Sequence, residues 1–95
     1  MKAQALLNER SWQGDNAFAE LEVWRVPEPV RGSRHAFKYR LAFVVDGECV
    51  VRFDNEAGKG DHWHRGATQQ PYDFSSLPTL LADFWRAVDD WRGSA

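Results

Sequence analysis

The chain has 95 residues, of which 12 are Lys or Arg and 14 are Asp or Glu, so its formal net charge is −2. Apolar residues make up 43% of the sequence, a composition typical of a folded globule and not of a disordered chain. Two domains of half this length would each bury too little surface to be stable. We therefore expect a single domain over residues 1–95, and the weak negative charge argues against non-specific binding of nucleic acid.

The single cysteine, Cys49, cannot form an intramolecular disulfide, which favours a reducing compartment. The sequence has no run of about 18 apolar residues that could span a bilayer. The first residues, MKAQALLNERSW, carry charged and polar side chains where a signal peptide needs an apolar stretch. These features predict a cytoplasmic protein without a membrane partner.

The first third of the chain contains one clear strand signal. Residues 3–10 fit either an edge strand or a short helix, and residues 13–15 form a turn. Over residues 19–23, apolar side chains alternate with two glutamates, which is the period of a half-buried strand, and we expect this strand to run from residue 16 to Pro27. Residues 28–34 contain proline, glycine and serine and therefore predict a loop.

The middle of the chain predicts a β-hairpin, because the β-rich runs HAFKYRLAFVV and ECVVRFDN are separated by Asp-Gly. A two-residue turn would place Leu41 opposite Arg52 and mix charged with apolar side chains on both faces. A three-residue loop at residues 45–47 instead places Leu41 opposite Val51 and leaves one face wholly apolar. We therefore expect the three-residue loop.

The opposite face of this hairpin is charged. In the expected register Lys38 faces Asp54 and Arg40 faces Arg52, and two like charges directly across a sheet normally destabilise it. An anion between the two arginines would remove this penalty, whereas the alternative is that both guanidinium groups point into solvent. Residues 31–65 carry seven basic and five acidic side chains and all three histidines, so positive charge is concentrated there.

The C-terminal run SSLPTLLADFWRAVDDWRGSA is the clearest helix signal. Its apolar residues recur every three or four positions from Leu77 to Trp91, which is one stripe of an amphipathic helix. Ser76 can cap its start and Gly93 can end it. The stripe, including its aromatic rings, should cover the apolar face of the sheet. The predicted fold is therefore α+β: an antiparallel sheet of four to five strands with this helix packed on one face.

The segment GKGDHWHRG, residues 58–66, follows the hairpin and is predicted to be a loop that folds back over the charged face. Its first two glycines would let backbone amides approach an anion, and Lys59 between them adds a positive charge, although the spacing matches no P-loop. If the segment is extended, His62 and His64 lie on one side and Trp63 on the other. Two nearby histidines suit acid–base chemistry or metal binding.

Three interpretations of these histidines stay open. A metal site would need a further ligand, such as Asp54 or Asp61, but there is no clustered cysteine and His35 is distant in sequence. Cleavage of RNA by its own 2′-hydroxyl needs a base, an acid and cations, and no cofactor. The third interpretation is a surface loop whose histidines only form hydrogen bonds. Under the cleavage hypothesis, without metal or cofactor, the catalytic residues are His62, His64, Lys59 and Asp61, and the substrate-binding residues are Lys38, Arg40, Arg52, Asp54, Trp63 and Arg65.

Residues 18–91 contain a KYRL strand, a DNE.GKGDH.H core, a following PY.F and a helix with LL.DF. This pattern resembles the TumE-family toxins of bacterial and archaeal toxin–antitoxin operons. Trp63 stands where a basic residue is commoner and Phe53 where tyrosine is usual, so no phenolic hydroxyl is expected to act at that position. The matching positions are Lys38, Tyr39, Arg40, Leu41, Asp54, Asn55, Gly58, Lys59, Gly60, Asp61, His62, His64, Pro71 and Tyr72.

The resemblance implies a small growth-inhibiting toxin with a cognate antitoxin that often carries a DNA-binding domain. We expect inhibition by metal-independent cleavage of an RNA substrate. The alternative is a non-enzymatic toxin or nucleic-acid-binding module neutralised by the same antitoxin. Transfer of a nucleotidyl or phosphoryl group ranks third, because it would need a nucleotide and Mg²⁺. A homodimer is a further partner that the sequence leaves open.

Overall fold

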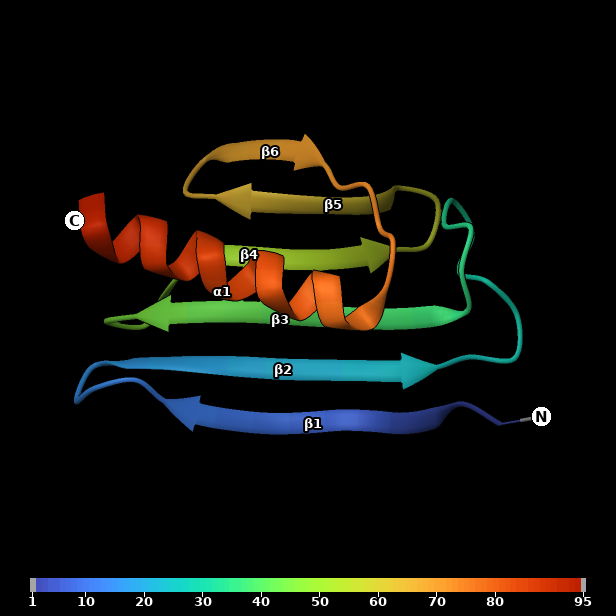
Figure 1. Ribbon diagram of the computed structural model, residues 1–95, viewed down its shortest axis with the longest axis horizontal. Helices are drawn as coiled ribbons and strands as arrows, with labels where there is room; N and C mark the ends of the chain where they lie inside the picture. The colour runs from blue at the N-terminus through green and yellow to red at the C-terminus, as the bar shows by residue number, and fades with distance from the viewer. Residues whose placement is uncertain (1, 95) are drawn as a thin grey trace.

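A computed structural model describes residues 2–94 as a six-stranded antiparallel sheet with one helix (Figure 1). The order of the strands in the sheet follows their order in the chain, so each strand pairs with the next one. The predicted α+β class is confirmed, but the sheet has six strands instead of four to five. The elements are β1 (Gln4–Trp12), β2 (Ala17–Arg25), β3 (Phe37–Val45), β4 (Glu48–Glu56), β5 (Gly60–Arg65), β6 (Thr68–Pro71) and α1 (Leu77–Ser94).

The segment predicted as a loop is mostly strand β5, so that prediction is wrong. Gly58 and Gly60 have φ angles of 87° and 75°, and this left-handed backbone forms the tight turn between β4 and β5. Trp63 then stacks on Phe53 of β4 with ring centroids 5.3 Å apart. The glycines at both ends of the segment are turn residues, and the short strand between them is fixed by this packing.

The β3–β4 hairpin closes with a two-residue turn, so the predicted three-residue loop is also wrong. Asp46 and Gly47 have φ angles of 52° and 78°, the pair of left-handed residues that a type I′ turn requires. A bulge next to the turn then shifts the register, so that Phe43 faces Val51. The shift keeps one face of the hairpin wholly apolar. The predicted separation of an apolar and a charged face is therefore confirmed, although the individual pairs differ.

The apolar face is covered by α1, which lies across β3 and β4 (Figure 1). Leu80 and Phe84 of the helix and Leu41 and Phe43 of β3 are completely buried, so the predicted packing of the helix stripe on the sheet is confirmed. This layer of aliphatic and aromatic side chains forms the core of the molecule.

The helix begins as predicted but does not end as predicted. The hydroxyl of Ser76 accepts a hydrogen bond from the backbone nitrogen of Thr79 at 3.2 Å, which caps the first turn. Gly93 does not stop the helix, because α1 continues through Ser94. No helix among residues 2–94 is long and apolar enough to cross a membrane.

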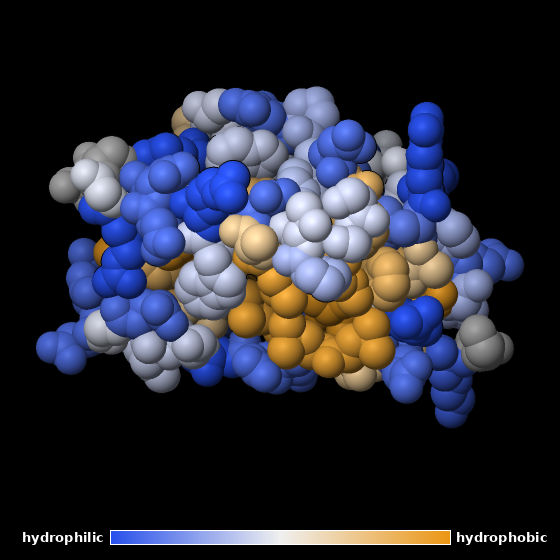
Figure 2. All heavy atoms as spheres, in the orientation of Figure 1, coloured by the Kyte–Doolittle hydropathy of each residue, from blue (hydrophilic) through white to orange (hydrophobic). Residues whose placement is uncertain are grey.

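The N-terminal segment forms the edge strand β1, one of the two structures that its sequence allowed. Two large apolar side chains of this strand, Leu6 and Trp12, are exposed. Figure 2 shows further apolar atoms gathered beside α1, on the side of the helix that faces β2 and β1. Leu7 of β1 and Leu81 of α1 are partly buried side chains that pack against the core. The helix therefore covers the β3–β4 part of the sheet more fully than the β1–β2 part.

Candidate functional site

The face of the sheet opposite α1, here called the open face, carries two neighbouring cross-strand rows of mostly polar side chains. Because side chains alternate along each strand, every second residue of β1 to β6 points to this face. The first row contains Asn8, Glu22, Arg40, Asp54, His62 and Pro71, and the second contains Arg10, Glu20, Ala42, Arg52, His64 and Gln69.

Opposite charges alternate along the first row. Arg40 lies between Glu22 of β2 and Asp54 of β4. The predicted pairs of Arg40 with Arg52 and of Lys38 with Asp54 are therefore wrong, because the shorter turn and the bulge in β4 together shift the register by two positions. With no like charges opposed, no anion is needed to relieve a repulsion between the two arginines. The prediction that all four charged residues share the face opposite the helix is confirmed.

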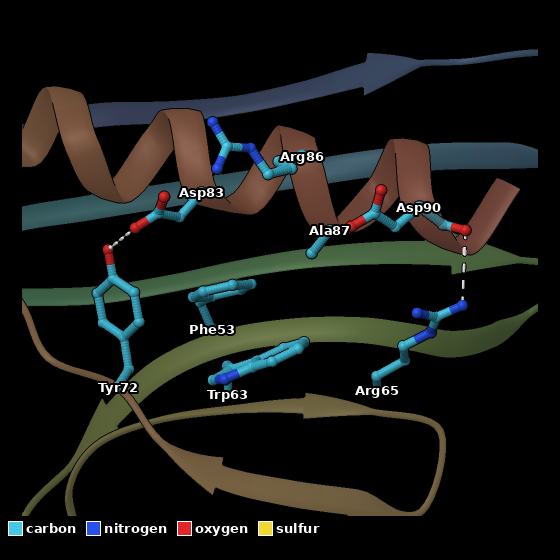
Figure 3. Close-up of a pocket in the computed structure, with 8 residues that line it drawn as sticks. All are labelled: Phe53, Trp63, Arg65, Tyr72, Asp83, Arg86, Ala87 and Asp90. Carbon is cyan, nitrogen blue, oxygen red and sulfur yellow. Dashed lines mark hydrogen bonds between the residues drawn. The ribbon is translucent and has the colours of Figure 1, made fainter. Parts of the chain in front are cut away.

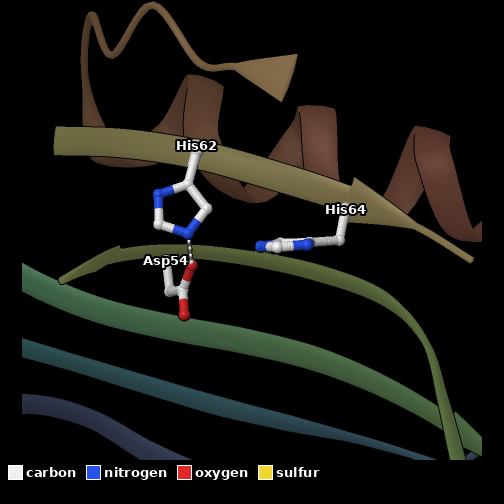
Figure 4. Close-up of side chains that lie close together, drawn as sticks. All are labelled: Asp54, His62 and His64. Carbon is white, nitrogen blue, oxygen red and sulfur yellow. Dashed lines mark ion pairs between the residues drawn. The ribbon is translucent and has the colours of Figure 1, made fainter. Parts of the chain in front are cut away.

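His62 and Asp54 form the buried centre of the open face (Figure 4). Both residues are 5% exposed, and Nε2 of His62 lies 2.8 Å from Oδ1 of Asp54. Nδ1 of His62 lies 3.0 Å from the carbonyl oxygen of Gly60. Since a carbonyl oxygen only accepts, Nδ1 carries a hydrogen. The imidazole is thus held on both sides, and the predicted solvent-accessible position is wrong for His62, because β5 turns this ring toward β4.

His64 lies beside His62 on the open face, and the two ring centroids are 4.9 Å apart. Nη2 of Arg52 donates a hydrogen bond to Nε2 of His64 at 3.0 Å, because a guanidinium group can only donate. Burial lowers the pKa of His64, and the nearby charge of Arg52 lowers it further. His64 is therefore a neutral imidazole at neutral pH and accepts a hydrogen from Arg52.

Two buried atoms at this centre have no hydrogen-bond partner within residues 2–94: Nε of Arg52 and Oδ1 of Asp54. Nε lies 3.3 Å from Oδ2 of Asp54, and Oδ1 lies 2.8 Å from His62, but both are ion-pair contacts without an aligned hydrogen bond. Buried polar atoms are rarely left unsatisfied in proteins. Unsatisfied buried atoms are expected at a site where a bound ligand supplies the missing hydrogen-bond partners.

Asp61, a predicted catalytic residue, points to the opposite face of the sheet, because neighbouring residues of β5 alternate. It accepts hydrogen bonds from the hydroxyl groups of Ser33 and Tyr39, the latter at 2.8 Å, and lies 2.6 Å from Nε2 of His35. Burial, followed by the hydrogen bond to Asp61, strongly raises the pKa of Tyr39, so its phenol stays a donor. Asp61 thus ties the 28–36 loop to β3 and β5, and its side chain points away from the face that carries His62 and His64.

Trp63 and Arg65, both predicted to bind substrate, lie on the helix side of β5 (Figure 3). They line a pocket of about 300 Å³ between the sheet and α1. The hydroxyl of Tyr72 donates to Asp83 at 2.6 Å at one end of this pocket. The sheet separates these side chains from the open face. The pocket is lined by Phe53, Trp63, Arg65, Tyr72, Asp83, Arg86, Ala87 and Asp90.

Lys59 lies in the turn before β5, where its Nζ is 3.3 Å from a carboxylate oxygen of Glu56. The adjacent Gly60 packs against the backbone of the 28–36 loop. A Cβ on Gly32 would lie only 2.7 Å from the nitrogen of Gly60, closer than real Cβ atoms approach. The close packing of two backbone segments therefore accounts for the glycines at positions 32 and 60.

The sequence patterns gave no role to Asn55, which is completely buried. Its Oδ1 accepts a hydrogen bond from the backbone nitrogen of Tyr39 at 2.9 Å, and its Nδ2 donates to the carbonyl of Phe37 at 2.7 Å. The side chain thus substitutes for backbone pairing where the β3–β4 ladder ends. The available signal was its position: Asn55 continues the inward alternation of Val51 and Phe53, where a polar side chain must be hydrogen-bonded.

Comparison with protein families identifies the class and the family. The family described as toxin TumE matches residues 4–92, which is nearly the whole chain and includes both faces of the sheet. The molecule is therefore a toxin, and such a toxin implies an antitoxin partner. The chain belongs to the TumE toxin family. Neither a search of curated proteins nor a search of solved structures gives a significant match.

Proposed function

We propose that this toxin inhibits growth by cleaving RNA on the open face, through attack of the RNA's own 2′-hydroxyl. The observation that carries the proposal is the arrangement around Arg52. A neutral, partly exposed histidine and a buried histidine–aspartate pair lie beside an arginine whose Nε lacks a hydrogen-bond partner. This arrangement supplies a proton acceptor, a held proton and a phosphate-binding cation, which are the groups that this reaction needs.

Arg52 binds the scissile phosphate and exposes the base. Its side chain is 33% exposed, so it can turn from His64 toward a bound anion. Nε2 of His64 is then free to take the proton of the 2′-hydroxyl. The 2′ oxygen forms a bond to phosphorus while the bond from phosphorus to the 5′ oxygen breaks. Arg52 stabilises the charge that develops on the phosphorane.

His62 supplies the proton for the departing 5′ oxygen. Both of its ring nitrogens face oxygen acceptors, so the geometry accommodates a hydrogen on each. Because the residue is only 5% exposed, a water carries the proton from His62 to the leaving group. Asp54 is a positioning residue that fixes the ring. Arg40 and Lys38 contact flanking phosphates, and the proposal assigns no catalytic role to Lys59 or Asp61.

Single-turnover cleavage of RNA by the metal-free protein in EDTA tests the proposal. The products should carry 2′,3′-cyclic phosphate and 5′-hydroxyl ends, because the attacking oxygen comes from the RNA. His64→Ala should lower the rate on the order of 10²-fold or more. Absence of cleavage would contradict the proposal, as would 3′-hydroxyl ends.

His62 is almost completely buried, so a substrate has little direct access to it. This burial favours a second candidate function, which is binding of RNA without cleavage. The open face also carries Phe18 and Trp24, which are partly exposed, and aromatic rings beside basic side chains bind single-stranded RNA by stacking. A pure binding function predicts a stable complex with intact RNA. The same assay separates the two, because only the nuclease produces shortened products.

A further inference from the structure

We propose that Asp54, His62 and His64 bind one divalent ion of the Zn²⁺ class, and that the bound ion switches off the acid–base pair. The binding part of this inference stands on the geometry of the three side chains. The inhibitory part rests on the proposed function, because it assumes that His62 and His64 transfer protons.

The three side chains converge on one point (Figure 4). One ligand atom of each lies within 4.8 Å of the ligand atoms of the other two, and Asp54 and His62 are buried. The contact of Nδ1 of His62 with the carbonyl of Gly60 is the support that metal-binding histidines usually have. It fixes the ring with Nε2 toward Asp54, so a ligand geometry exists before any ion binds.

The contact between His62 and Asp54 itself favours a cation at this point. With the hydrogen on Nδ1, the neutral imidazole presents a lone pair at Nε2. Nε2 lies 2.8 Å from Oδ1 of Asp54, a buried carboxylate oxygen that receives no aligned hydrogen bond from the described residues. Two acceptors at this distance repel unless a positive charge lies between them. Either a proton on Nε2 or a metal ion can occupy this position, and binding of the ion would release such a proton to solvent.

The chemical types of the three ligand atoms determine which metal ion should bind. Two imidazole nitrogens and one carboxylate oxygen match the ligands of Zn²⁺ sites that keep a fourth position open. Mg²⁺ and Ca²⁺ prefer oxygen ligands, so they should bind weakly here. Cys49 lines a small pocket together with Arg52 and His64, so a thiol is near the site and has to be tested as a competing ligand.

Arg52 opposes metal binding. Its Nη2 donates a hydrogen bond to Nε2 of His64, the atom that would bind the metal, and its positive charge lies next to Asp54. An incoming ion has to displace this contact, and the repulsion between two cations weakens the affinity. Replacing Arg52 by glutamine should therefore strengthen metal binding. If the ion bound by accident elsewhere on the surface, replacing Arg52 would not be expected to strengthen its binding.

Titration of the full-length metal-free protein with Co²⁺, a spectroscopic probe for Zn²⁺ sites, tests the inference. The visible absorption of bound Co²⁺ should appear and saturate at one equivalent, and Zn²⁺ should abolish it by displacement. His64→Ala and Asp54→Asn should weaken binding on the order of 10-fold to 100-fold. Arg52→Gln should strengthen it, and Cys49→Ser should leave it unchanged. Circular dichroism on each variant verifies the fold, and His64→Ala carries the test if Asp54→Asn unfolds.

The outcomes separate the metal site from the proposed function. No saturable Co²⁺ spectrum, equal binding by wild type and His64→Ala, or binding lost only in Cys49→Ser would each overturn the metal site. In the cleavage assay, Zn²⁺ added to protein that EDTA has freed of metal should suppress cleavage. A later excess of EDTA should restore it. Cleavage that appears only with Zn²⁺ would keep the site but overturn the inhibitory role. Failure of all cleavage refutes the proposed nuclease, while the Co²⁺ titration still decides whether the ion binds.

Discussion

At the scale of single residues, the polar motif of the central chain divides into two sets that serve different faces of the sheet. Asp54 and His62 point to the open face and form its buried centre. Asn55 and Asp61, each next to one of them in sequence, point inward and hold β3, β5 and the 28–36 loop together. The alternation of a β-strand thus allows a short motif to supply both a candidate site and its support.

The inward-pointing side chain of Asn55 leads to a prediction about the stability of the protein. Asn55→Ala should lower the free energy of unfolding by roughly 2 to 4 kcal/mol, because it leaves the backbone nitrogen of Tyr39 and the carbonyl of Phe37 buried without partners. Urea denaturation followed by circular dichroism measures the change. Gln69→Ala on the exposed strand β6 is the control and should change little. A loss for Asn55→Ala no larger than that of the control would contradict the assigned role.

The single cysteine makes a prediction about reactivity. Cys49 is exposed, but partial desolvation raises the pKa of its thiol, and the neighbouring Arg40 and Arg52 offset only part of this. A raised pKa means a smaller thiolate fraction at a given pH, and the thiolate is the reactive species. Iodoacetamide at pH 8 should therefore alkylate native protein more slowly than urea-unfolded protein. Equal rates in the two states would show that folding does not raise the pKa of this thiol.

At the scale of elements, the parts that the sequence predicted well are those with a long, regular pattern. The stripe of α1 and the alternation of β2 each repeat over several turns or residues, so the apolar faces and their packing could be inferred. The register of β3 and β4 could not, because a bulge has no strong signature in one sequence and moves every pair by one position. For the same reason the alternating charges around Arg40 were not foreseen.

The contact between the 28–36 loop and the β4–β5 turn makes a prediction that separates close packing from backbone strain. Gly32 and Gly66 both have positive φ, but only at Gly32 would an added Cβ meet another backbone segment. Gly66→Ala should cost about 1 kcal/mol of unfolding free energy from strain alone. Gly32→Ala should cost clearly more, because the loop has to move away from Gly60. Equal losses in thermal or urea unfolding would argue against the close approach.

At the scale of the whole molecule, the packing of α1 on one side of the sheet leaves the open face available to a partner. An antitoxin is the partner that the family implies, and the basic side chains of this face offer an acidic segment a favourable target. We predict that Arg40→Glu combined with Arg52→Glu weakens the complex by about 10-fold or more at low salt. Arg86→Glu on the exposed side of α1 is the matched control. Unchanged affinity of the double variant, measured by isothermal titration calorimetry, would place the antitoxin elsewhere.

The family resemblance in the sequence correctly indicated the toxin, but the position of each motif residue required the three-dimensional structure. His62, Trp63 and His64 are consecutive, yet only the two histidines share a face with Arg52. Local sequence cannot show that Asp61 contacts His35, because 26 residues separate them. The sequence therefore indicated that His62, His64 and Arg52 could lie near one another, but not that Asp61, Trp63 and Arg65 point to the other face.

The central claim, that the open face carries the toxic activity, is tested most directly by growth inhibition with two neighbouring variants. His64 and Gln69 face each other across β5 and β6, so His64→Ala and Gln69→Ala disturb the same part of the sheet. His64→Ala should abolish growth inhibition with little change in melting temperature, and Gln69→Ala should remain toxic. Full toxicity of a folded His64→Ala protein, expressed at the wild-type level, would contradict the account.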